Sequence, residues 1–216
     1  PIKGVIWYQG EANVGRSEQY GDLFPALITD WRRQWRSDFP FYFVQLANFM
    51  ESKKIQPDSE WAALREAQTK ALKLDQVGMA VTIDIGLADD IHPKNKQEVG
   101  RRLALVALAG SYGKNVSSSA PVFQNYIIKG NKMELDFGQK QDGFQIKGTT
   151  LKGFTIAGPD RVFYPAEAMV HDGKIILSST EVPAPLAARY GWADNPDCNL
   201  YGENGLPVAP FRTDCW

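Results

Sequence analysis

The sequence predicts an α/β protein in which a parallel sheet with crossover helices is followed by a β-rich region. Strand-like and helix-like segments alternate through the first half of the chain, which is typical of parallel strands joined by helices. Beyond Ser111 only short segments of β character remain, separated by Gly, Asn and Asp, and these predict antiparallel strands. We therefore expect two domains, residues 1–115 and residues 116–216.

The first strand is expected at residues 2–8, an apolar run that ends at the polar loop Gln9-Gly10-Glu11. A helix is expected from Ser17, and Pro40 closes it. Its apolar side chains recur at helical spacing on one face: Tyr20, Phe24, Leu27, Ile28, Trp31 and Trp35. A second buried strand follows at residues 41–46.

A second helix is expected after Ser59, a typical N-cap residue. Its predicted inner face consists of Trp61, Leu64, Gln68, Ala71 and Leu72. We interpret Arg65, on the same helix, as a buried anchor for a loop carboxylate. The third strand is expected at residues 77–83, and the third helix follows Pro93, which a first turn tolerates, and ends near Gly110.

The second region is expected to form a small sandwich or an appended sheet. Asn131 and Asp172-Gly173 are hairpin-type turn signals. The expected strands are residues 122–128, 133–137, 154–156, 168–170 and 174–177.

Composition excludes several classes of function. The formal net charge of −1 gives no electrostatic case for nucleic acid or an anionic membrane surface. No segment has the length and apolar purity of a transmembrane helix. Two cysteines, Cys198 and Cys215, are too few for a disulfide framework, and the sequence does not show whether they are bridged.

Asp89-Asp90-Ile91-His92 is the segment that points most directly to chemistry. An Asp-x-x-His tetrapeptide at a helix entry can hold a carboxylate against an imidazole, which orients a general base and stabilises its protonated form. The alternative is a helix-capping aspartate beside a surface histidine. A metal site is disfavoured because the cluster has no recognised ligand spacing, and the only other histidine, His171, is interpreted as a turn residue.

Gln9-Gly10-Glu11 follows a predicted strand, so it is expected to converge with the Asp89–His92 loop at the carboxyl edge of the sheet. Gln9 can donate to a developing oxyanion, and Gly10 allows close approach of the backbone to a substrate. Glu11 can serve as a general acid. A polar turn without function remains the alternative, and no serine follows a buried strand at the strained turn that exposes a nucleophile.

Four parts of the chain carry a family resemblance: residues 7–13 (WYQGEAN), residues 61–68 (WAALREAQ), residues 89–96 (DDIHPKNK) and the tail, residues 189–214. Together they resemble the sialate O-acetylesterases of the SGNH (GDSL-type) hydrolase superfamily. The resemblance implies a three-layer α/β/α SGNH-hydrolase-like parallel sheet, here incomplete because its amino-terminal strands are missing. It also implies Ser-His-Asp acyl transfer, without metal or cofactor, that releases acetate from an O-acetylated sialic acid or related glycan.

In this resemblance His92 is the base, Asp89 its orienting partner, and Gln9 and Gly10 the oxyanion donors. The family's serine block, a Gly-Gln-Ser-Asn-like sequence, is absent. We therefore expect the chain to be the carboxyl-terminal part of a longer protein, inactive alone, whose upstream segment supplies the serine. We expect self-association through an exposed sheet edge without that segment, and the family implies a secreted, periplasmic or lysosome-like location.

Two other functions stay open. One is a glycoside hydrolase fragment that uses Glu11 as its general acid. The other is a non-catalytic glycan-binding module that presents Trp192, Tyr190 and Phe163 to sugar rings.

Overall fold

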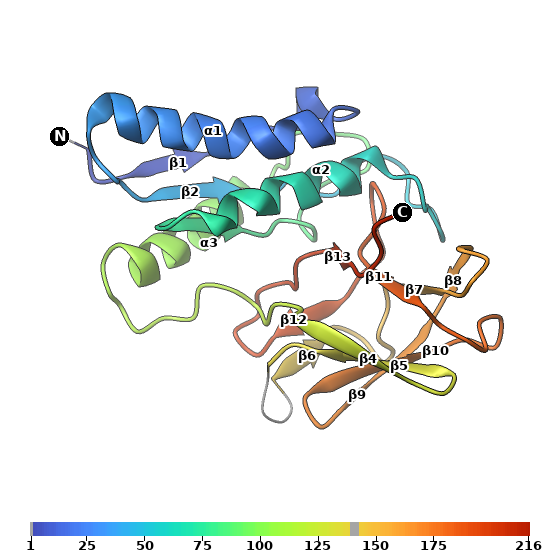
Figure 1. The fold of residues 1–216 in the computed structure, drawn as a ribbon. Coiled ribbons are helices and arrows are strands. Elements are labelled where there is room, and N and C mark those ends of the chain that lie inside the picture. The colour runs from blue at the N-terminus through green and yellow to red at the C-terminus, as the bar shows by residue number, and fades with distance from the viewer. Residues whose placement is uncertain (1, 139–142) are drawn as a thin grey trace. The chain divides into compact units, whose positions relative to one another are not determined.

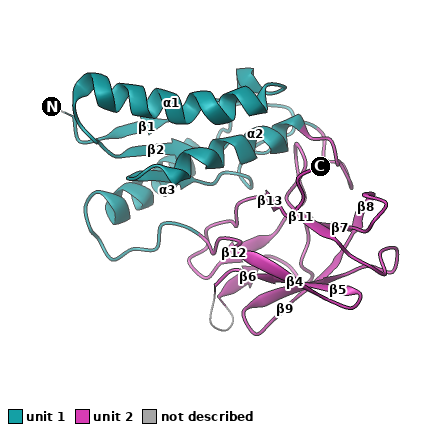
Figure 2. Cartoon of the chain, viewed as in Figure 1, with its two compact units in different colours: residues 1–50, 60–119 teal, residues 51–59, 120–216 magenta. Residues whose placement is uncertain are grey.

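A computed structural model describes residues 2–138 and 143–216, which form two compact units. Unit 1 comprises residues 1–50 and 60–119, and unit 2 comprises residues 51–59 and 120–216 (Figure 2). The expected mixture of a parallel sheet with several antiparallel sheets is confirmed (Figure 1). The domain boundary expected between residues 115 and 116 stays a prediction.

Unit 1 contains a parallel sheet in the order β1-β2-β3, and its three α-helices are the three that the sequence predicts. The strands are β1 (Val5–Trp7), β2 (Phe41–Val44) and β3 (Val77–Ala80). The helices are α1 (Ser17–Trp35), α2 (Glu60–Thr69) and α3 (Lys96–Gly110), with short 3-10 turns η1 (Glu11–Asn13) and η2 (Lys70–Lys73).

An aromatic core packs α1 against one face of this sheet. Phe24 of α1 makes edge-on ring contacts with Phe41 at 5.9 Å and with Phe43 at 5.1 Å between centroids. Trp7 of β1 contacts Trp31 in the same way, at 5.8 Å. Side chains alternate along a strand, so Phe41 and Phe43 share this face and Tyr42 points to the other.

Helix α3 packs against that other face. The Tyr42 hydroxyl lies 2.7 Å from the hydroxyl of Ser111, directly after α3. Gly78, which pairs with Tyr42 in the parallel register, leaves room for Val106 of α3. Close approach of a helix to a strand is a common reason for glycine inside a strand.

Gly78→Ala is therefore expected to destabilise unit 1 by about 1–3 kcal/mol. A Cβ at this position would overlap the Cγ1 of Val106 and lie 3.1 Å from Tyr42 Cδ1. The matched control is Gly100→Ala in α3, where a Cβ meets no atom within 4 Å and alanine favours the helix. Urea unfolding of both variants checks the prediction, and equal midpoints would contradict it.

Several element boundaries differ from the expectation. Helix α1 ends at Trp35, before Pro40, because Arg36 adopts a left-handed conformation (φ 50°) whose amide donates to carbonyls of the last turn. Trp35 is 57% exposed, and its ring packs edge-on against Phe39 at 5.7 Å between centroids. Pro93 precedes α3 and is not in its first turn, because Asn95 caps the helix by accepting from the Glu98 amide.

Two further differences concern the segments that flank β3. After Thr69 the chain tightens into the 3-10 turn η2, which rotates Leu72 off the inner face of α2 and leaves it 41% exposed. Strand β3 ends at Ala80 and not at Ile83. The next residues turn instead, with the Ile85 amide donating to the Thr82 carbonyl.

Unit 2 is built from antiparallel sheets, as expected. One sheet has the order β4-β5-β10-β9, a second the order β13-β11-β7-β8, and a third pairs β12 with β6. The strands are β4 (Asn125–Lys129), β5 (Lys132–Asp136), β6 (Phe144–Ile146), β7 (Phe154–Ala157), β8 (Phe163–Pro165), β9 (Glu167–His171), β10 (Lys174–Ser178), β11 (Ala187–Tyr190), β12 (Leu200–Gly202) and β13 (Phe211–Arg212).

The two hairpin turns that the sequence predicts are present. Gly130-Asn131 joins β4 to β5, and Asp172-Gly173 joins β9 to β10 with positive φ angles of 48° and 71°. Strands β6, β8, β11, β12 and β13 were not predicted. They are short, two to four residues each, so they carry little periodic signal.

The segment 51–59 belongs to unit 2 although it lies between β2 and α2 in the sequence. The Gln56 side chain hydrogen-bonds to Asp194, whose other carboxylate oxygen accepts from the Ser59 hydroxyl at 2.6 Å. The carbonyl of Pro57 accepts from Arg189 at 2.8 Å and from the Trp192 indole at 3.1 Å. These bonds fix the segment in place.

Candidate active site

The loops after β1 and β2 are tied together at the carboxyl edge of the sheet by Gln68 of α2. Its Nε2 donates to the carbonyls of Gln9 and Val44, both at 3.3 Å, and its Oε1 accepts from the amide of Leu46 at 2.9 Å. The sequence marks Gln68 only as a polar residue on an apolar helix face. That position is the signal that could have revealed its bridging role, because a buried amide needs partners.

Gln9 is held by its neighbours. Its Nε2 donates to Asn13 Oδ1 at 2.7 Å, and the Tyr20 hydroxyl lies 3.2 Å from both its carbonyl oxygen and its Oε1. A glutamine amide carries two hydrogens, and Asn13 uses one. The amide therefore has one hydrogen beyond the one that Asn13 uses.

Gly10 and Glu11 complete this loop. Gly10 is buried, with a φ of 154° that favours glycine, and a Cβ there would lie 3.4 Å from side-chain atoms of Gln68, Leu46 and Leu64. Glu11 opens the turn η1. Burial raises the pKa of Tyr8 to about 12, and the nearby charge of Glu11 adds to that effect.

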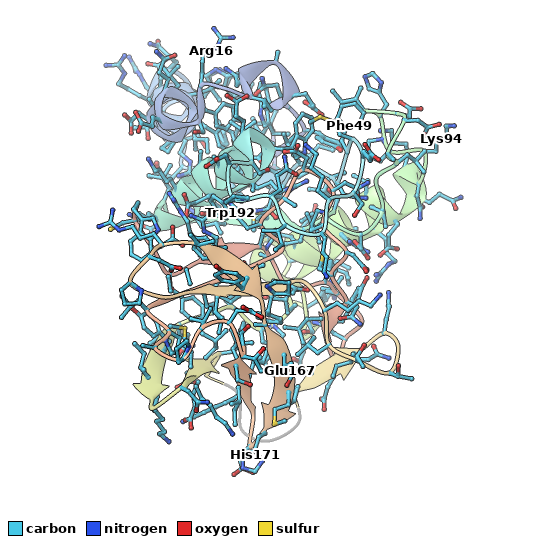
Figure 3. All side chains as sticks on the ribbon, turned by 90° about the vertical axis from the view of Figure 1, so that its right-hand side faces the viewer. Arg16, Phe49, Lys94, Glu167, His171 and Trp192 are labelled. Atoms are coloured by element: carbon cyan, nitrogen blue, oxygen red, sulfur yellow. The ribbon has the colours of Figure 1, made fainter. Side chains whose placement is uncertain are left out.

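The Asp89–His92 loop lies against the loop after β2. Phe49 bridges to Leu87, the Met50 amide donates to the Ala88 carbonyl at 3.1 Å, and Asn48 Oδ1 accepts from the Gly86 amide at 2.7 Å. Figure 3 places Phe49 and Lys94, which follows this loop, in the same region of unit 1. Strand order alone predicted that the two polar loops end at one edge.

His92 has an 82% exposed side chain, and Asp90 lies closest to it among the acidic groups described. Asp90 Oδ1 is 3.6 Å from His92 Nδ1 and accepts from the His92 amide at 2.9 Å. Asp89 is exposed. Across the described residues no hydrogen bond or ion pair joins His92 to Asp89 or to Gln9, Gly10 or Glu11, so the roles assigned to these residues stay predictions.

Arg65 is buried, as expected from the sequence, and it holds two backbone carbonyls, whereas the expected contact with a loop carboxylate stays a prediction. Its Nε donates to Leu46 at 2.8 Å and one terminal nitrogen donates to Ala47 at 2.9 Å. Ala47 also accepts from the Trp61 indole at 2.8 Å. The helix α2 therefore sets the path of the loop after β2.

Arg102 of α3 holds the turn after β3, as Arg65 of α2 holds the loop after β2. It forms a two-pronged ion pair with Asp84, at 2.6 and 2.9 Å, and donates to the Val81 carbonyl at 2.7 Å. Glu98 pairs with both Arg101 and Arg102, and these guanidinium groups, Arg101 foremost, lower the pKa of Glu98 to about 2. Asp84 therefore stabilises the turn after β3 through its ion pair with Arg102.

Glu98→Gln is expected to reduce the decrease in stability that accompanies a fall in pH. The pKa of Glu98 is depressed in the folded protein, so its stabilising effect is full above the unfolded value near 4.5 and is lost as pH falls toward about 2. Unfolding midpoints measured across this range check the prediction. The control is Glu18→Gln, an exposed first-turn glutamate of α1, which should keep the wild-type slope. Parallel curves for Glu98→Gln and wild type would contradict the prediction.

Other candidate residues lie in unit 2. Tyr190 and Phe163 are buried, and the Arg189 guanidinium lies 3.9 Å from the Phe163 ring, so these two rings do not face solvent as the glycan-binding alternative requires. Trp192 is half-buried. His171 lies at the tip of the β9–β10 hairpin (Figure 3). No disulfide joins Cys198 to Cys215.

Two general properties bear on the chemistry. Within residues 2–138 and 143–216, His, Cys, Asp and Glu side chains do not gather into a group of three that could hold a metal ion. None of the helices described is both long and apolar enough to cross a membrane.

Comparisons with known proteins were made for the whole chain. Residues 1–109 match the family described as "Carbohydrate esterase, sialic acid-specific acetylesterase". The chain is 32% identical over 240 residues to sialate O-acetylesterase of Mus musculus, and 31% identical to that of Homo sapiens; each alignment covers 97% of this chain, and 44% and 45% of the relatives. The chain therefore spans somewhat under half the length of these proteins.

A solved structure is similar over the entire chain. It is described as the crystal structure of "a novel carbohydrate acetylesterase from Xanthomonas citri", and it shares 46% sequence identity with a TM-score of 0.93. The match covers 100% of this chain and 51% of that one. Sequence and structure comparisons thus agree on the same class of protein.

Proposed function

This chain belongs to the sialic acid-specific acetylesterase family of carbohydrate esterases, and from that premise we propose that its parent protein releases acetate from O-acetylated carbohydrate, with O-acetylated sialic acid as the preferred substrate. The observation that carries the proposal is the match across both units to a carbohydrate acetylesterase at 46% identity. We also propose that unit 1 is the carboxyl-terminal part of a three-layer α/β/α sheet of the SGNH type.

In the proposed reaction His92 takes the proton from a serine hydroxyl as its oxygen attacks the acetyl carbonyl. The sugar oxygen leaves with that proton, and water then attacks the acetyl-serine to release acetate and restore the serine. The second amide hydrogen of Gln9 and the backbone amide of Gly10 stabilise the tetrahedral anion, a contribution on the order of 3 kcal/mol for each donor. Gln68 supports them by holding the Gln9 carbonyl.

The proposal places the serine outside residues 1–216. The chain spans somewhat under half the length of its curated relatives. Two serines of unit 1 have structural roles: Ser17 begins α1, and Ser111 hydrogen-bonds to Tyr42. Asp89 orients His92, and Asp90 shapes the turn by accepting the His92 amide.

The test is acetate release by the whole parent protein from O-acetylated sialic acid, acetylated xylan and a non-acetylated glycoside. Acetate from the sialic acid at the highest kcat/KM supports the proposal in full. Acetate from xylan alone would overturn the choice of sugar. Release of sugar from the glycoside would favour the glycosidase that uses Glu11.

A further inference from the structure

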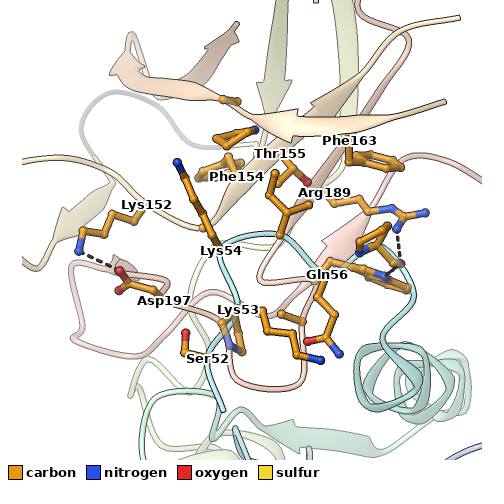
Figure 4. A pocket seen from close by; sticks show the side chains of 18 of the residues that line it. Ser52, Lys53, Lys54, Gln56, Lys152, Phe154, Thr155, Phe163, Arg189 and Asp197 are labelled. Atoms are coloured by element: carbon orange, nitrogen blue, oxygen red, sulfur yellow. Dashed lines mark hydrogen bonds and ion pairs between the residues drawn. The ribbon is translucent and has the colours of Figure 1, made fainter. Parts of the chain in front are cut away.

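Unit 2 contains a cavity of about 420 Å³, and its lining includes none of the residues assigned to acyl transfer. Its walls come from the segment 51–59, from β7 and β8, and from the turn after β11 (Figure 4). All of the lining residues belong to unit 2. The volume falls in the range of small-ligand sites, about 300–1,000 Å³.

One wall is preformed. Gln56 and Pro57 are fixed by Asp194, Arg189 and Trp192 through the hydrogen bonds described above. Because these residues are already ordered, little further conformational entropy is lost when a ligand binds. Lys53 and Lys54 line the cavity two to three residues before Gln56 in the same segment.

The lining carries more positive than negative charge. Lys152 pairs with Asp197 at 2.9 Å, and Arg189 forms a buried two-pronged pair with Asp214 at 2.6 and 2.9 Å. Within the described parts of the chain, no carboxylate lies within 4 Å of Lys53 or Lys54. Two cations thus line the cavity with their charges uncompensated, which favours an anionic ligand.

The rest of the lining suits a ligand with both apolar and hydroxyl surfaces. Figure 4 shows Lys54 extending toward Phe154, with Thr155 on the neighbouring part of β7. Trp192 and Pro165 add apolar surface to the walls. A sugar ring with an acidic substituent presents this combination of apolar, hydroxyl and charged groups.

We propose that this cavity binds a carboxylate-bearing sugar residue of a glycan chain, with Lys53 and Lys54 paired to the carboxylate. The sugar part of this inference rests on the proposed function, whereas the anionic part rests on the two lysines. The carboxylate has two sources in glycans, a sialic acid or a uronic acid. The site makes unit 2 a selector for acidic glycans.

The test measures binding to the full chain by calorimetry, with two probes that carry no O-acetyl ester. These are the methyl glycoside of N-acetylneuraminic acid and a xylo-oligosaccharide substituted with glucuronic acid, each compared with its carboxyl-reduced form. At least one acidic probe is expected to bind about tenfold more tightly than its reduced form, with affinity that falls as salt rises. The probe that binds identifies the source of the carboxylate.

Matched variants separate charge from structure. The double variant Lys53→Gln, Lys54→Gln should lose about tenfold or more in affinity, and Lys53→Arg, Lys54→Arg should retain binding. The control Lys114→Gln, Lys132→Gln removes two exposed charges elsewhere and should bind as wild type does. Equal affinity for acidic and reduced probes, or unchanged binding by the double glutamine variant, overturns the inference.

These probes carry no O-acetyl ester, so the result is independent of turnover. Binding of an acidic probe by the chain, together with no acetate release by the whole parent protein, would support the cavity site and overturn the proposed esterase. Acetate release by the whole parent protein, without binding of either acidic probe to the chain, would support the esterase and overturn the cavity site.

Discussion

Replacing His92 with alanine is expected to lower acetate release by the whole parent protein on the order of 10³-fold or more, with little change in stability. The proposed reaction needs a base to take the serine proton, and no other group in unit 1 is placed for that role by the family resemblance. The side chain is 82% exposed, so its removal leaves no cavity in the core. The measurement is kcat/KM for acetate release, with urea unfolding as the check on folding.

His171→Ala is the matched control, because His171 is the only other histidine and lies in the β9–β10 hairpin of unit 2. It should keep wild-type kcat/KM. Comparing Asp89→Asn with Asp90→Asn then identifies the orienting carboxylate: the proposal expects the larger loss from Asp89. A larger loss from Asp90, which is 3.6 Å from the imidazole, would transfer that role to Asp90. Full activity of His92→Ala would refute the proposed base.

The largest effect on stability is expected from Arg65→Met, which should lower the free energy of unfolding by about 3 kcal/mol. The Arg65 side chain is fully buried and donates to the carbonyls of Leu46 and Ala47. Methionine fills part of the space but leaves the Leu46 carbonyl without this donor. A buried acceptor that loses its partner pays the full cost of desolvation.

Urea unfolding measures this change, and Arg33→Met serves as its control. Arg33 is exposed and pairs with Asp30 within α1, so its loss should change stability by less than about 1 kcal/mol. A similar small change for Arg65→Met would show that the carbonyls find water when the guanidinium is removed. Activity of the Arg65 variant should fall as well, because the loop after β2 contacts the Asp89–His92 loop.

Local periodicity predicted the elements of unit 1 well, since α1, α2 and α3 present long apolar faces to a sheet. It failed where a local geometry or a distant partner decides the outcome. Trp35 and Leu72 continue the apolar pattern, yet a left-handed residue and a 3-10 turn end their helices early. Nothing near residues 51–59 in the sequence indicates that this segment packs with β11 and its following turn.

In the candidate site, too, the sequence predicted local features but not contacts between distant residues. The sequence indicated both polar loops because each follows an apolar strand. It could not indicate that Gln68 joins Gln9 to Val44, because those hydrogen bonds link residues far apart in the chain. The motif spacing assigned the orienting role to Asp89, whereas in the fold Asp90 lies 3.6 Å from the imidazole, because the direction of each side chain is set by the folded turn.

The placement of residues 51–59 within unit 2 has a consequence for how the protein is made. During synthesis this segment leaves the ribosome about 135 residues before Arg189, Trp192 and Asp194, to which it binds, a delay of about 7–27 s at 5–20 residues per second. Until then Ser59 and Gln56 have no Asp194 to bind. Unit 1 can complete its helices in that interval, whereas the cavity of unit 2 can form only after residues 189–194 have been translated.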